Sequence, residues 1–574
     1  FVANLFLKTL LITANPSGMT YDEVIYAAEA QSIVKYGTDL TGKWRPWHFE
    51  PSDSYYTELT STVLTPGFLL FPNNPILASK FIPLLLGSLI PILLGFIAYK
   101  LRKETAVFAL TAFFATLNPW IFQFSRMGYD SLFSIGFYLT AMVCVLYAHH
   151  WKKLWAIVPA TIGFFQYQGH KPLLVPLLLL CLLFLILESY EFKKILTHYK
   201  KIITDKNILA ACAVVLFSVA LTVLYLVRLP HLTSGERISE FSIYDATEIS
   251  SRVNDQRRIS LSSPLTVLFE NKYTAIFTTL TQRFLDSFNV NRLFISGDAA
   301  VDTFTVLEYG YFHIIDILVL IVALAYLLHK KQDHPTLLFI LGFIVIGAIP
   351  NVIRTGASWI IFRAAFAFLG LVLLMGTGTA EFLKLHSRKY AVVLILFYTI
   401  TTTPFLYAYF VKYPISHTRN IGFYERVVAS YLKRMTNDAP VVIIPDRDDA
   451  TFNYLIHYNQ LLTKENEKQV NTALTTRVFE VDAIKIPGNC PNNIDEIGFT
   501  TTFVYLMNQP CEVASDPTEI TEIKSLIDSG TIFTVYNDKL CSQYSLPAYP
   551  HVTKNLFAVE KLSNQEFCET FFSR

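Results

Sequence analysis

Charged residues are scarce in this sequence. Only 16% of its 574 residues are Asp, Glu, Lys or Arg, whereas soluble domains carry about a quarter. Hydrophobic residues make up 52%, and the mean hydropathy is +0.40. The formal net charge is only +2, and the basic residues form short clusters between apolar runs. These features argue against a nucleic-acid partner and indicate a membrane protein.

Other signals are missing as well. The first apolar run ends near Ala14 without the positively charged leader of a cleaved signal peptide, and it is shorter than a spanning helix, so we expect part of a first span there. No Cys-x-x-Cys pair occurs among the seven cysteines, which argues against a zinc site. The two repeated halves of many secondary transporters are not apparent either.

What the sequence has in abundance is long apolar runs. They lie near 76–99, 105–122, 131–148, 154–168, 172–188, 208–227, 311–328, 336–350, 359–379 and 390–411. With the partial first span, they predict about eleven membrane-spanning helices.

Basic clusters stand at alternate connections between these runs. They are Lys100, Arg102 and Lys103; Lys152 and Lys153; Lys193, Lys194, Lys200, Lys201 and Lys206; Lys330 and Lys331; and Lys384, Arg388 and Lys389. By the positive-inside rule this face is cytoplasmic, so the other connections lie outside.

The division of the chain follows from this topology. We predict a transmembrane domain over 1–411 with outer loops at 16–75 and 229–310, and a soluble extracytoplasmic α/β domain over 412–574. In the long loop, the apolar residues from Pro264 to Phe288 recur at helical spacing, as in a helix lying on the membrane surface. A solvated connector explains that stretch almost equally well.

The C-terminal segment has a soluble composition. Ala439 to Pro445 and Thr501 to Met507 read as short strands, with helical patterns between them. Four cysteines fall in this segment: Cys490, Cys511, Cys541 and Cys568. An even number on an oxidising side suggests two disulfides, with three pairings open, and four free thiols are the alternative.

Two adjacent carboxylates, Asp22 and Glu23, stand where the chain leaves the first span and starts an apparent helix. An N-cap with an acidic first turn explains them structurally. Alternatively, a partly desolvated carboxylate at the bilayer surface has the raised basicity needed to take a proton from an acceptor hydroxyl. The two readings are evenly matched, because ionisable groups at membrane depth are functional-site candidates.

A second polar segment runs from Phe124 to Ser131 on the same outer face. Arg126 can pair with Asp130 four residues later at the interface, which would be a structural role. A planar guanidinium is equally suited to bind a phosphate.

Two more clusters fall on this face. One contains His170 and Lys171, and the other runs from Pro350 through Arg354 to Arg363. Each alone reads as an interfacial anchor. Together with the carboxylates, however, they predict a pocket open to the membrane for a substrate with an anionic phosphate head and a long apolar tail.

The polar segments resemble those of the GT-C glycosyltransferase superfamily, in particular bacterial relatives of the protein O-mannosyltransferases and of the lipid A aminoarabinose transferases. The similarity spans about residues 15–425. It rests on Tyr21-Asp22-Glu23, Tyr26-Ala27, Glu29-Ala30, Gly37, Asp39, Gly42, Ser125-Arg126, Asp130-Ser131, Leu293 to Asp298, Ile349-Pro350 and Arg363.

The resemblance implies an inverting glycosyltransferase whose donor is a sugar on a polyprenyl or dolichyl phosphate. It implies Asp22 as the catalytic base, Glu23 as a residue that helps to hold acceptor or donor, and Arg126 as the ligand of the donor phosphate. Asp130 would line the same cavity. We add His170, Lys171, Arg354 and Arg363 as expected phosphate or sugar contacts.

Some features depart from the family pattern. Thr62 to Gly67 replace the His- or Lys-bearing Pro-Pro segment of some relatives, which puts acceptor contacts there in doubt. The loop at 229–310 has no room for the β-trefoil insertion of the eukaryotic protein mannosyltransferases, which favours a prokaryotic envelope enzyme.

Three other functions stay open at this stage: a secondary transporter, a non-enzymatic scaffold that presents the C-terminal domain, and an envelope polysaccharide ligase or polymerase. The transporter is disfavoured by scarce mid-span charges, and the scaffold by the number of helices. A divalent metal could assist catalysis, but an adjacent Asp and Glu are too few ligands to predict one. The expected partners are therefore a polyprenyl-phosphate sugar, membrane lipid and an acceptor.

Overall fold

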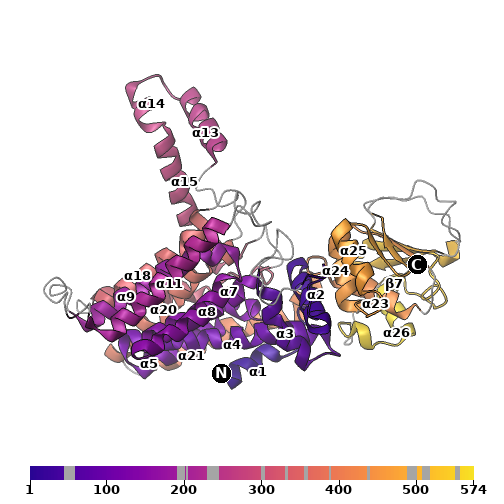
Figure 1. Ribbon diagram of the computed structural model, residues 1–574, viewed down its shortest axis with the longest axis horizontal. Coiled ribbons are helices and arrows are strands. Elements are labelled where there is room, and N and C mark those ends of the chain that lie inside the picture. Colours follow the sequence, from indigo (N-terminus) through magenta and orange to yellow (C-terminus); the bar gives the residue numbers. More distant parts are fainter. Residues whose placement is uncertain are drawn as a thin grey trace.

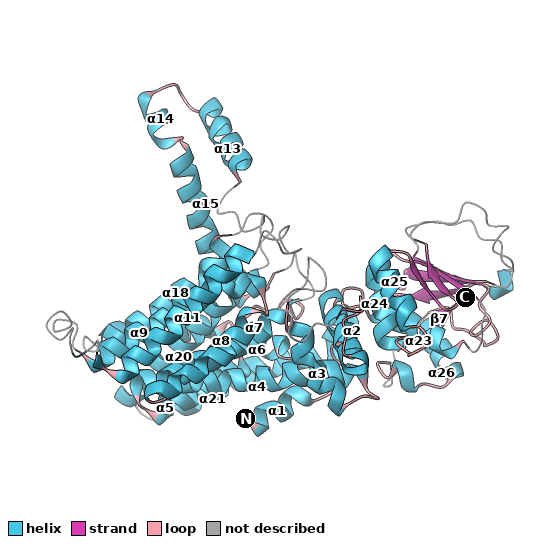
Figure 2. Ribbon diagram, in the orientation of Figure 1, coloured by secondary structure: helices cyan, strands magenta, loops and turns pink. Residues whose placement is uncertain are grey.

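The computed structural model consists of a long helical bundle that carries a small α/β domain at one end (Figures 1 and 2). It describes residues 1–43, 58–190, 201, 204–228, 245–298, 304–329, 334–353, 360–386, 389–435, 440–459, 461–487, 501–506, 517–549 and 556–574. We call the bundle end next to the α/β domain the domain end, and the opposite one the basic end, because Lys100 and Lys103 lie there.

Seven helical runs of the described residues are long and apolar enough to cross a membrane. They are α4 (Pro75–Arg102), α7 (Asp130–Tyr147), Gln168–Ser189, which contains η2 (Gln168–Leu173) and α9 (Leu174–Ser189), α11 (Lys206–Arg228), α18 (His334–Val352), α20 (Ala365–Leu385), and Lys389–Ser416, which contains α21 (Lys389–Tyr407), η7 (Ala408–Lys412) and α22 (Tyr413–Ser416). Together with the C-terminal sheet, they confirm the predicted α-helical polytopic membrane protein with a small α/β domain.

Of the about eleven predicted helices, counting the partial first one, these seven meet the length and hydropathy of a span among the described residues. Other apolar segments form shorter helices: α1 (Val2–Thr9), α3 (Thr60–Leu70), α5 (Thr105–Leu117), α6 (Pro119–Phe124), η1 (His150–Ala156), α8 (Ile157–Phe164), α17 (Ile315–His329) and α19 (Ile360–Arg363). The expected span at 105–122 is broken because Asn118 caps α6, its Oδ1 accepting from the Ile121 amide at 2.9 Å, and Pro119 follows.

Helix α20 forms the centre of the bundle. It packs against α5, α17 and α18, and 83% of its spanning window is buried. Gly376 and Gly378 allow this, since a Cβ there would lie within 2.5 Å of Thr111 and Ala323 atoms. Small residues at such contacts let membrane helices approach closely. Helix α21, in contrast, lies at the edge of the bundle, with only 22% of its window buried.

A side arm leaves the bundle and points away from it (Figure 1). It consists of α13 (Ala246–Ile259), α14 (Pro264–Phe269) and α15 (Lys272–Asp286), and the short α16 (Val290–Phe294) follows. The predicted helical stretch from Pro264 to Phe288 is thus two helices, because Asn271 caps α15 by accepting from the Tyr273 and Thr274 amides.

The C-terminal domain holds one seven-stranded sheet in the order β2-β3-β1-β4-β6-β5-β7. Its elements are α23 (Phe423–Arg434), β1 (Val441–Ile444), α24 (Asp448–Asn459), α25 (Glu467–Thr476), β2 (Phe479–Val481), β3 (Ile484–Ile486), β4 (Thr502–Leu506), η9 (Pro517–Glu519), β5 (Thr521–Lys524), β6 (Thr531–Tyr536), η10 (Val559–Lys561), α26 (Asn564–Phe571) and β7 (Phe572–Ser573). The two predicted strands are β1 and β4, which pair in parallel, with Val441 opposite Thr502.

One disulfide closes this domain, between Cys541 and Cys568. Of the three predicted pairings, this is the one in which Cys490 would join Cys511, and both of those lie outside the described residues. The cysteines expected in apolar helices, Cys144, Cys181 and Cys212, are free thiols.

Helix α2 (Tyr21–Tyr36) and α3 connect the bundle to this domain. Buried residues of α2 such as Val24 and Ala27 belong to the same hydrophobic cluster as Phe423 and Tyr454. The predicted division at 411/412 stays a prediction, but the hydrophobic core is continuous across it. The first outer segment and the C-terminal domain therefore pack as one unit.

Candidate active site

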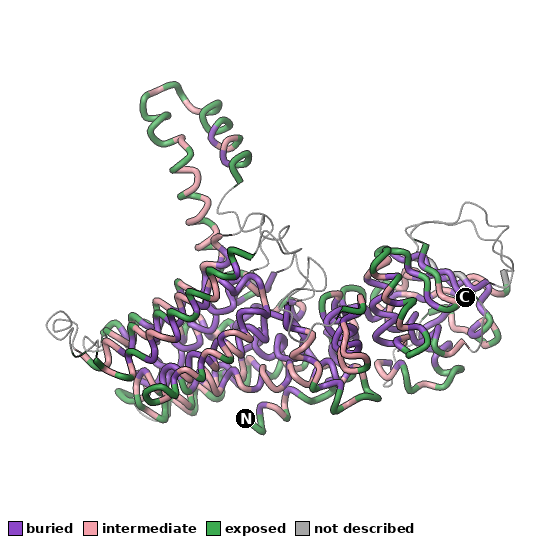
Figure 3. Tube along the Cα trace, viewed as in Figure 1, coloured by how far each residue is buried: buried purple, intermediate pink, exposed green. Residues whose placement is uncertain are grey.

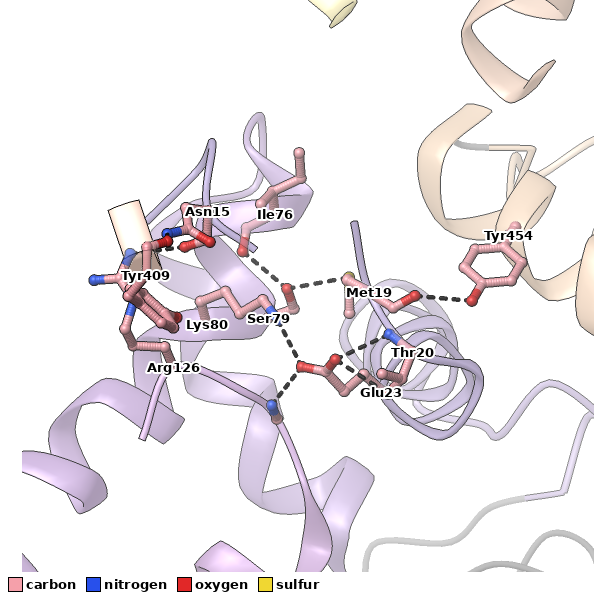
Figure 4. A network of polar contacts seen from close by, with 11 residues as sticks. Asn15, Met19, Thr20, Glu23, Ile76, Ser79, Lys80, Arg126, Tyr409 and Tyr454 are labelled. Carbon is pink, nitrogen blue, oxygen red and sulfur yellow. Dashed lines mark hydrogen bonds and ion pairs between the residues drawn. The ribbon is translucent and has the colours of Figure 1, made fainter. Parts of the chain in front are cut away.

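The site forms around the first turn of α2. Thr20 caps this helix, and Glu23 Oε2 accepts from the Thr20 amide at 2.9 Å and from its hydroxyl at 3.1 Å. Glu23 Oε1 accepts from Lys80 Nζ at 2.5 Å and from the amide of Gly128 (Figure 4). The side chains of Glu23 and Lys80 are only 1% and 0% exposed. Glu23 thus fixes the start of α2 against α4 and the turn before α7.

Asp22 differs from its neighbour, because it is exposed. Its charge reaches Tyr129, where burial first, and then the carboxylates of Glu23 and Asp22, raise the pKa of the phenol well above its ordinary value. Of the adjacent pair, Asp22 is therefore the exposed carboxylate, while Glu23 is buried and both of its oxygens accept hydrogen bonds.

Asp130, the first residue of α7, lies close to this turn. Its Oδ2 accepts from the Tyr26 hydroxyl at 3.1 Å, and its Oδ1 accepts from the Ser131 amide at 2.7 Å. Tyr26 follows Asp22 by one helical turn, so the two share a face of α2. The structure thus brings Asp22, Tyr26 and Asp130 to one place.

Arg126 has a different environment from the one expected for a phosphate ligand. Its side chain is fully buried, and it donates to the carbonyls of Lys8, Leu10 and Asn15. Its Nε donates to the Tyr409 hydroxyl at 3.0 Å. The guanidinium thus joins the N-terminal segment to η7 (Figure 4), and its predicted contact with a phosphate stays a prediction.

Lys171 lies in a second polar group at the domain end. Its Nζ donates to Glu58 Oε1 at 2.7 Å, and the Tyr225 hydroxyl donates to the same oxygen at 3.1 Å. The ammonium also lies 3.9 Å from the centre of the Tyr225 ring. Asp130 is near enough to act on Lys171 electrostatically. Sequence reasoning missed Glu58, because one carboxylate in an outer loop carries no signal of its distant partner.

His170 contacts α19, the short helix that ends at Arg363. His170 Nε2 lies 2.7 Å from the carbonyl oxygen of Phe362, which precedes Arg363. Both side chains are buried. Arg354, the other cation predicted in this region, lies outside the described residues.

A cavity of about 270 Å³ lies between α2 and the C-terminal domain. It is lined by Tyr21, Ile25, Glu29, Leu40, Thr41, Lys43, Asp449, Asn453, Leu474, Thr475 and Arg477. The Tyr21 hydroxyl donates to Asp449 Oδ2, and the Arg447 guanidinium lies 4.1 Å from the centre of the Tyr21 ring. The sequence signal for this wall is the charged turn after β1, which reads as a simple strand end.

The residues that the structure describes contain no group of three or more His, Cys, Asp or Glu side chains that could hold a metal ion. The chemistry that the site offers by itself is a carboxylate for proton transfer, beside buried cations, a phenol and a cavity.

Comparisons with known proteins give structural likenesses. The sequence matches no protein-family model and no curated protein. The chain is similar to the archaeal oligosaccharyltransferase AglB from Archaeoglobus fulgidus, with 11% identity and a TM-score of 0.42 over 88% of this chain and 69% of that chain. It is also similar to ArnT from Cupriavidus metallidurans bound to undecaprenyl phosphate, with 9% identity and a TM-score of 0.38 over 94% and 98%.

Both of these solved proteins are members of the GT-C superfamily. Because both TM-scores lie below 0.5, we base the proposed function on the residues of this chain.

Proposed function

We propose that this protein is an inverting glycosyltransferase that moves a sugar from a polyprenyl-phosphate donor to an acceptor hydroxyl. The observation that carries this proposal is the contrast within the carboxylate pair. Glu23 is buried and held by Lys80, whereas Asp22 is exposed at the start of the same helix, close to Asp130 and to the wall of a cavity. An exposed carboxylate at a fixed helix start suits a general base.

In the proposed reaction, Asp22 takes the proton of the acceptor hydroxyl while the oxygen of that hydroxyl attacks the anomeric carbon of the donor sugar. The bond from that carbon to the phosphate oxygen breaks, and polyprenyl phosphate leaves with the electron pair. One displacement inverts the anomeric carbon, so no covalent intermediate on the protein is needed. Stabilisation of the leaving phosphate would supply much of the acceleration.

The donor would approach from the bundle, where Lys171, His170 and Arg363 lie. Two of these are cations inside a membrane domain, and such groups usually mark substrate paths. We also keep Arg354 as a proposed contact of the donor phosphate or sugar. Arg126 stays in the proposal as a ligand of the donor phosphate, and the backbone carbonyls that accept from its guanidinium would hold it in place.

The acceptor would approach through the cavity on the other side of α2. Its wall alternates acidic and basic groups with apolar ones, which suits a polar molecule with several hydroxyls. The residues after 412 supply five of the eleven residues of that wall. This gives the C-terminal domain a role in shaping acceptor access.

We further propose that the domain end faces the outside of a prokaryotic cytoplasmic membrane. Two observations support this orientation: the basic clusters at the opposite end, and the disulfide between Cys541 and Cys568. Disulfides persist in oxidising compartments.

The test uses the purified full-length chain in liposomes with a panel of radiolabelled polyprenyl-phosphate sugars and an envelope extract as acceptor. Asp22→Asn should lower transfer by about 10²-fold or more, because the base is lost, while donor binding in a filter assay stays at the wild-type level. Asp255→Asn, at an exposed carboxylate of the side arm, is the matched control and should transfer normally.

Full transfer by Asp22→Asn would remove Asp22 from the role of base. If the wild type neither binds nor consumes any donor of the panel, the glycosyltransferase proposal fails, and uptake of small solutes by the same liposomes then tests the transporter alternative.

A further inference from the structure

The side arm (α13 to α15, residues 245–286) is the most exposed part of the described chain that still carries many large apolar side chains. Figure 1 shows it standing away from the bundle and running across the direction of the bundle helices, and Figure 3 shows that little of it is buried. Leu261, Tyr273 and Phe277 are 91%, 85% and 72% exposed. Exposure of such side chains to water is unfavourable, so we expect another apolar surface to cover them.

The apolar residues of α15 form one stripe. Tyr273, Ile276, Phe277, Leu280 and Phe284 recur at the spacing of one helical face. The preceding helix adds to it, since α14 exposes Leu265, Val267, Leu268 and Phe269.

The opposite face of α15 is covered by α13, which is polar. Arg252 Nη1 donates to the Thr279 hydroxyl at 3.0 Å, and Arg257 Nε donates to the Glu270 carbonyl at 2.7 Å. The arm as a whole is therefore amphipathic, with a polar helix on one side and the apolar stripe on the other.

The base of the arm is fixed at the end of a spanning helix. Asn351, in the last turn of α18, donates from Nδ2 to the Arg283 carbonyl at 2.9 Å and to the Ser287 hydroxyl at 2.8 Å. Arg283 Nη1 in turn donates to the Val352 carbonyl at 3.3 Å. The arm thus leaves the bundle at the level where α18 leaves the membrane.

We propose that the side arm lies flat in the interface of the same bilayer that the bundle spans, with the stripe of α14 and α15 inserted among the lipids. Two observations select the lipid surface as the occupant: the base of the arm lies at the end of α18, and the arm runs across the direction of the bundle helices. Helices of this kind bury their apolar face at the boundary between headgroups and acyl chains.

The charge of the arm selects the kind of lipid interaction. Between Asp245 and Asp286 it carries five Lys or Arg and five Asp or Glu residues, so its formal charge is zero. Insertion must then come from apolar burial, and a zwitterionic bilayer should suffice.

The experiment uses the full chain as single copies in phosphatidylcholine nanodiscs. Phe277→Trp places a tryptophan in the stripe, and Asn254→Trp, on an exposed position of α13, is the matched control; the emission of the six native tryptophans is subtracted with the wild type. Phosphatidylcholine brominated in the upper acyl chain should quench the Phe277→Trp signal about threefold more strongly than the control signal.

Equal quenching of the two variants would overturn the proposal. In that case the emission maximum identifies what replaces the lipid: long-wavelength emission at Phe277→Trp means that solvent covers the stripe, and short-wavelength emission without quenching means that protein covers it.

Discussion

At the scale of single residues, the buried pair of Glu23 and Lys80 decides how the candidate site is held. Both side chains have lost their water, so each needs the other's charge. The pair links α2 to α4, and the Gly128 amide adds the turn before α7. The position of Asp22 therefore depends on the ion pair between Glu23 and Lys80.

Lys80→Met should therefore lower the free energy of unfolding by about 3–5 kcal/mol, because it leaves Glu23 buried without a counter-charge. The double variant with Glu23→Gln should lose less than Lys80→Met alone, since no charge is then stranded. Denaturant unfolding of the full chain in detergent measures these values.

The matched control is Lys100→Met, which breaks a pair with Glu188 whose side chains are 20% and 22% exposed. Such partly exposed pairs contribute only about 0–1 kcal/mol. Equal losses for Lys80→Met and Lys100→Met would show that the Glu23 pair contributes no more than a surface one.

At the scale of elements, the contact between α2 and α24 joins the first outer segment to the C-terminal domain. The Tyr454 hydroxyl donates to the Met19 carbonyl at 2.8 Å, and Lys35 Nζ donates to the Leu462 carbonyl at 2.9 Å. His457 lies between the helices, fully buried, with Nδ1 accepting from the Gln31 amide at 3.2 Å. This hydrogen bond needs an unprotonated Nδ1, so His457 is neutral in the folded protein.

Burial first, and then the charge of Lys80, lower the pKa of His457 from its ordinary 6.5 to about 3. Between these values the unfolded chain binds a proton that the folded chain does not, so the free energy of unfolding falls as the pH drops. The slope is about 1.4 kcal/mol per pH unit. In a plot of melting temperature against pH, His457→Gln should reduce the fall at acid pH. His149→Gln, at an exposed histidine, should leave that fall unchanged. If the melting temperatures of wild type and His457→Gln fall equally with pH, protonation of His457 is not the cause.

The elements themselves were largely predictable, and their contacts were not. Hydropathy located the spanning helices because burial in lipid imposes long apolar runs. It did not show that α5 and α17 would be only 13 and 15 residues long, since apolar composition does not indicate where a helix ends. The parallel pairing of β1 with β4 could not be predicted, because β2 and β3 lie between them in the chain and the sequence does not indicate which strands are neighbours.

The site shows the same limit. Asp22 and Asp130 could be singled out because polar groups are conspicuous beside apolar runs. The partners of Arg126 are backbone carbonyls, which leave no mark in a sequence. Asp449, on the wall of the cavity, lies more than four hundred residues from Tyr21, so only the fold brings the two together.

At the scale of the whole molecule, the proposed function depends on which end of the bundle faces the outside of the cell. By the positive-inside rule, the basic clusters predict that the basic end lies inside the cell. The disulfide supports the proposal that the domain end lies outside it. The two signals are independent, since one reflects membrane insertion and the other the redox state of a compartment. Both therefore support the proposed topology.

We therefore expect Cys541 and Cys568 to be oxidised in native membranes, and the C-terminal domain to be cleaved by protease in intact spheroplasts. A cysteine introduced by His149→Cys near the basic end should react with a membrane-impermeant maleimide only in inverted vesicles. Reaction of His149→Cys in spheroplasts, together with reduced Cys541 and Cys568, would reverse the orientation. The candidate base would then face the cytoplasm, where a nucleotide-activated sugar could serve as donor, and the proposed lipid-linked donor would lose its rationale.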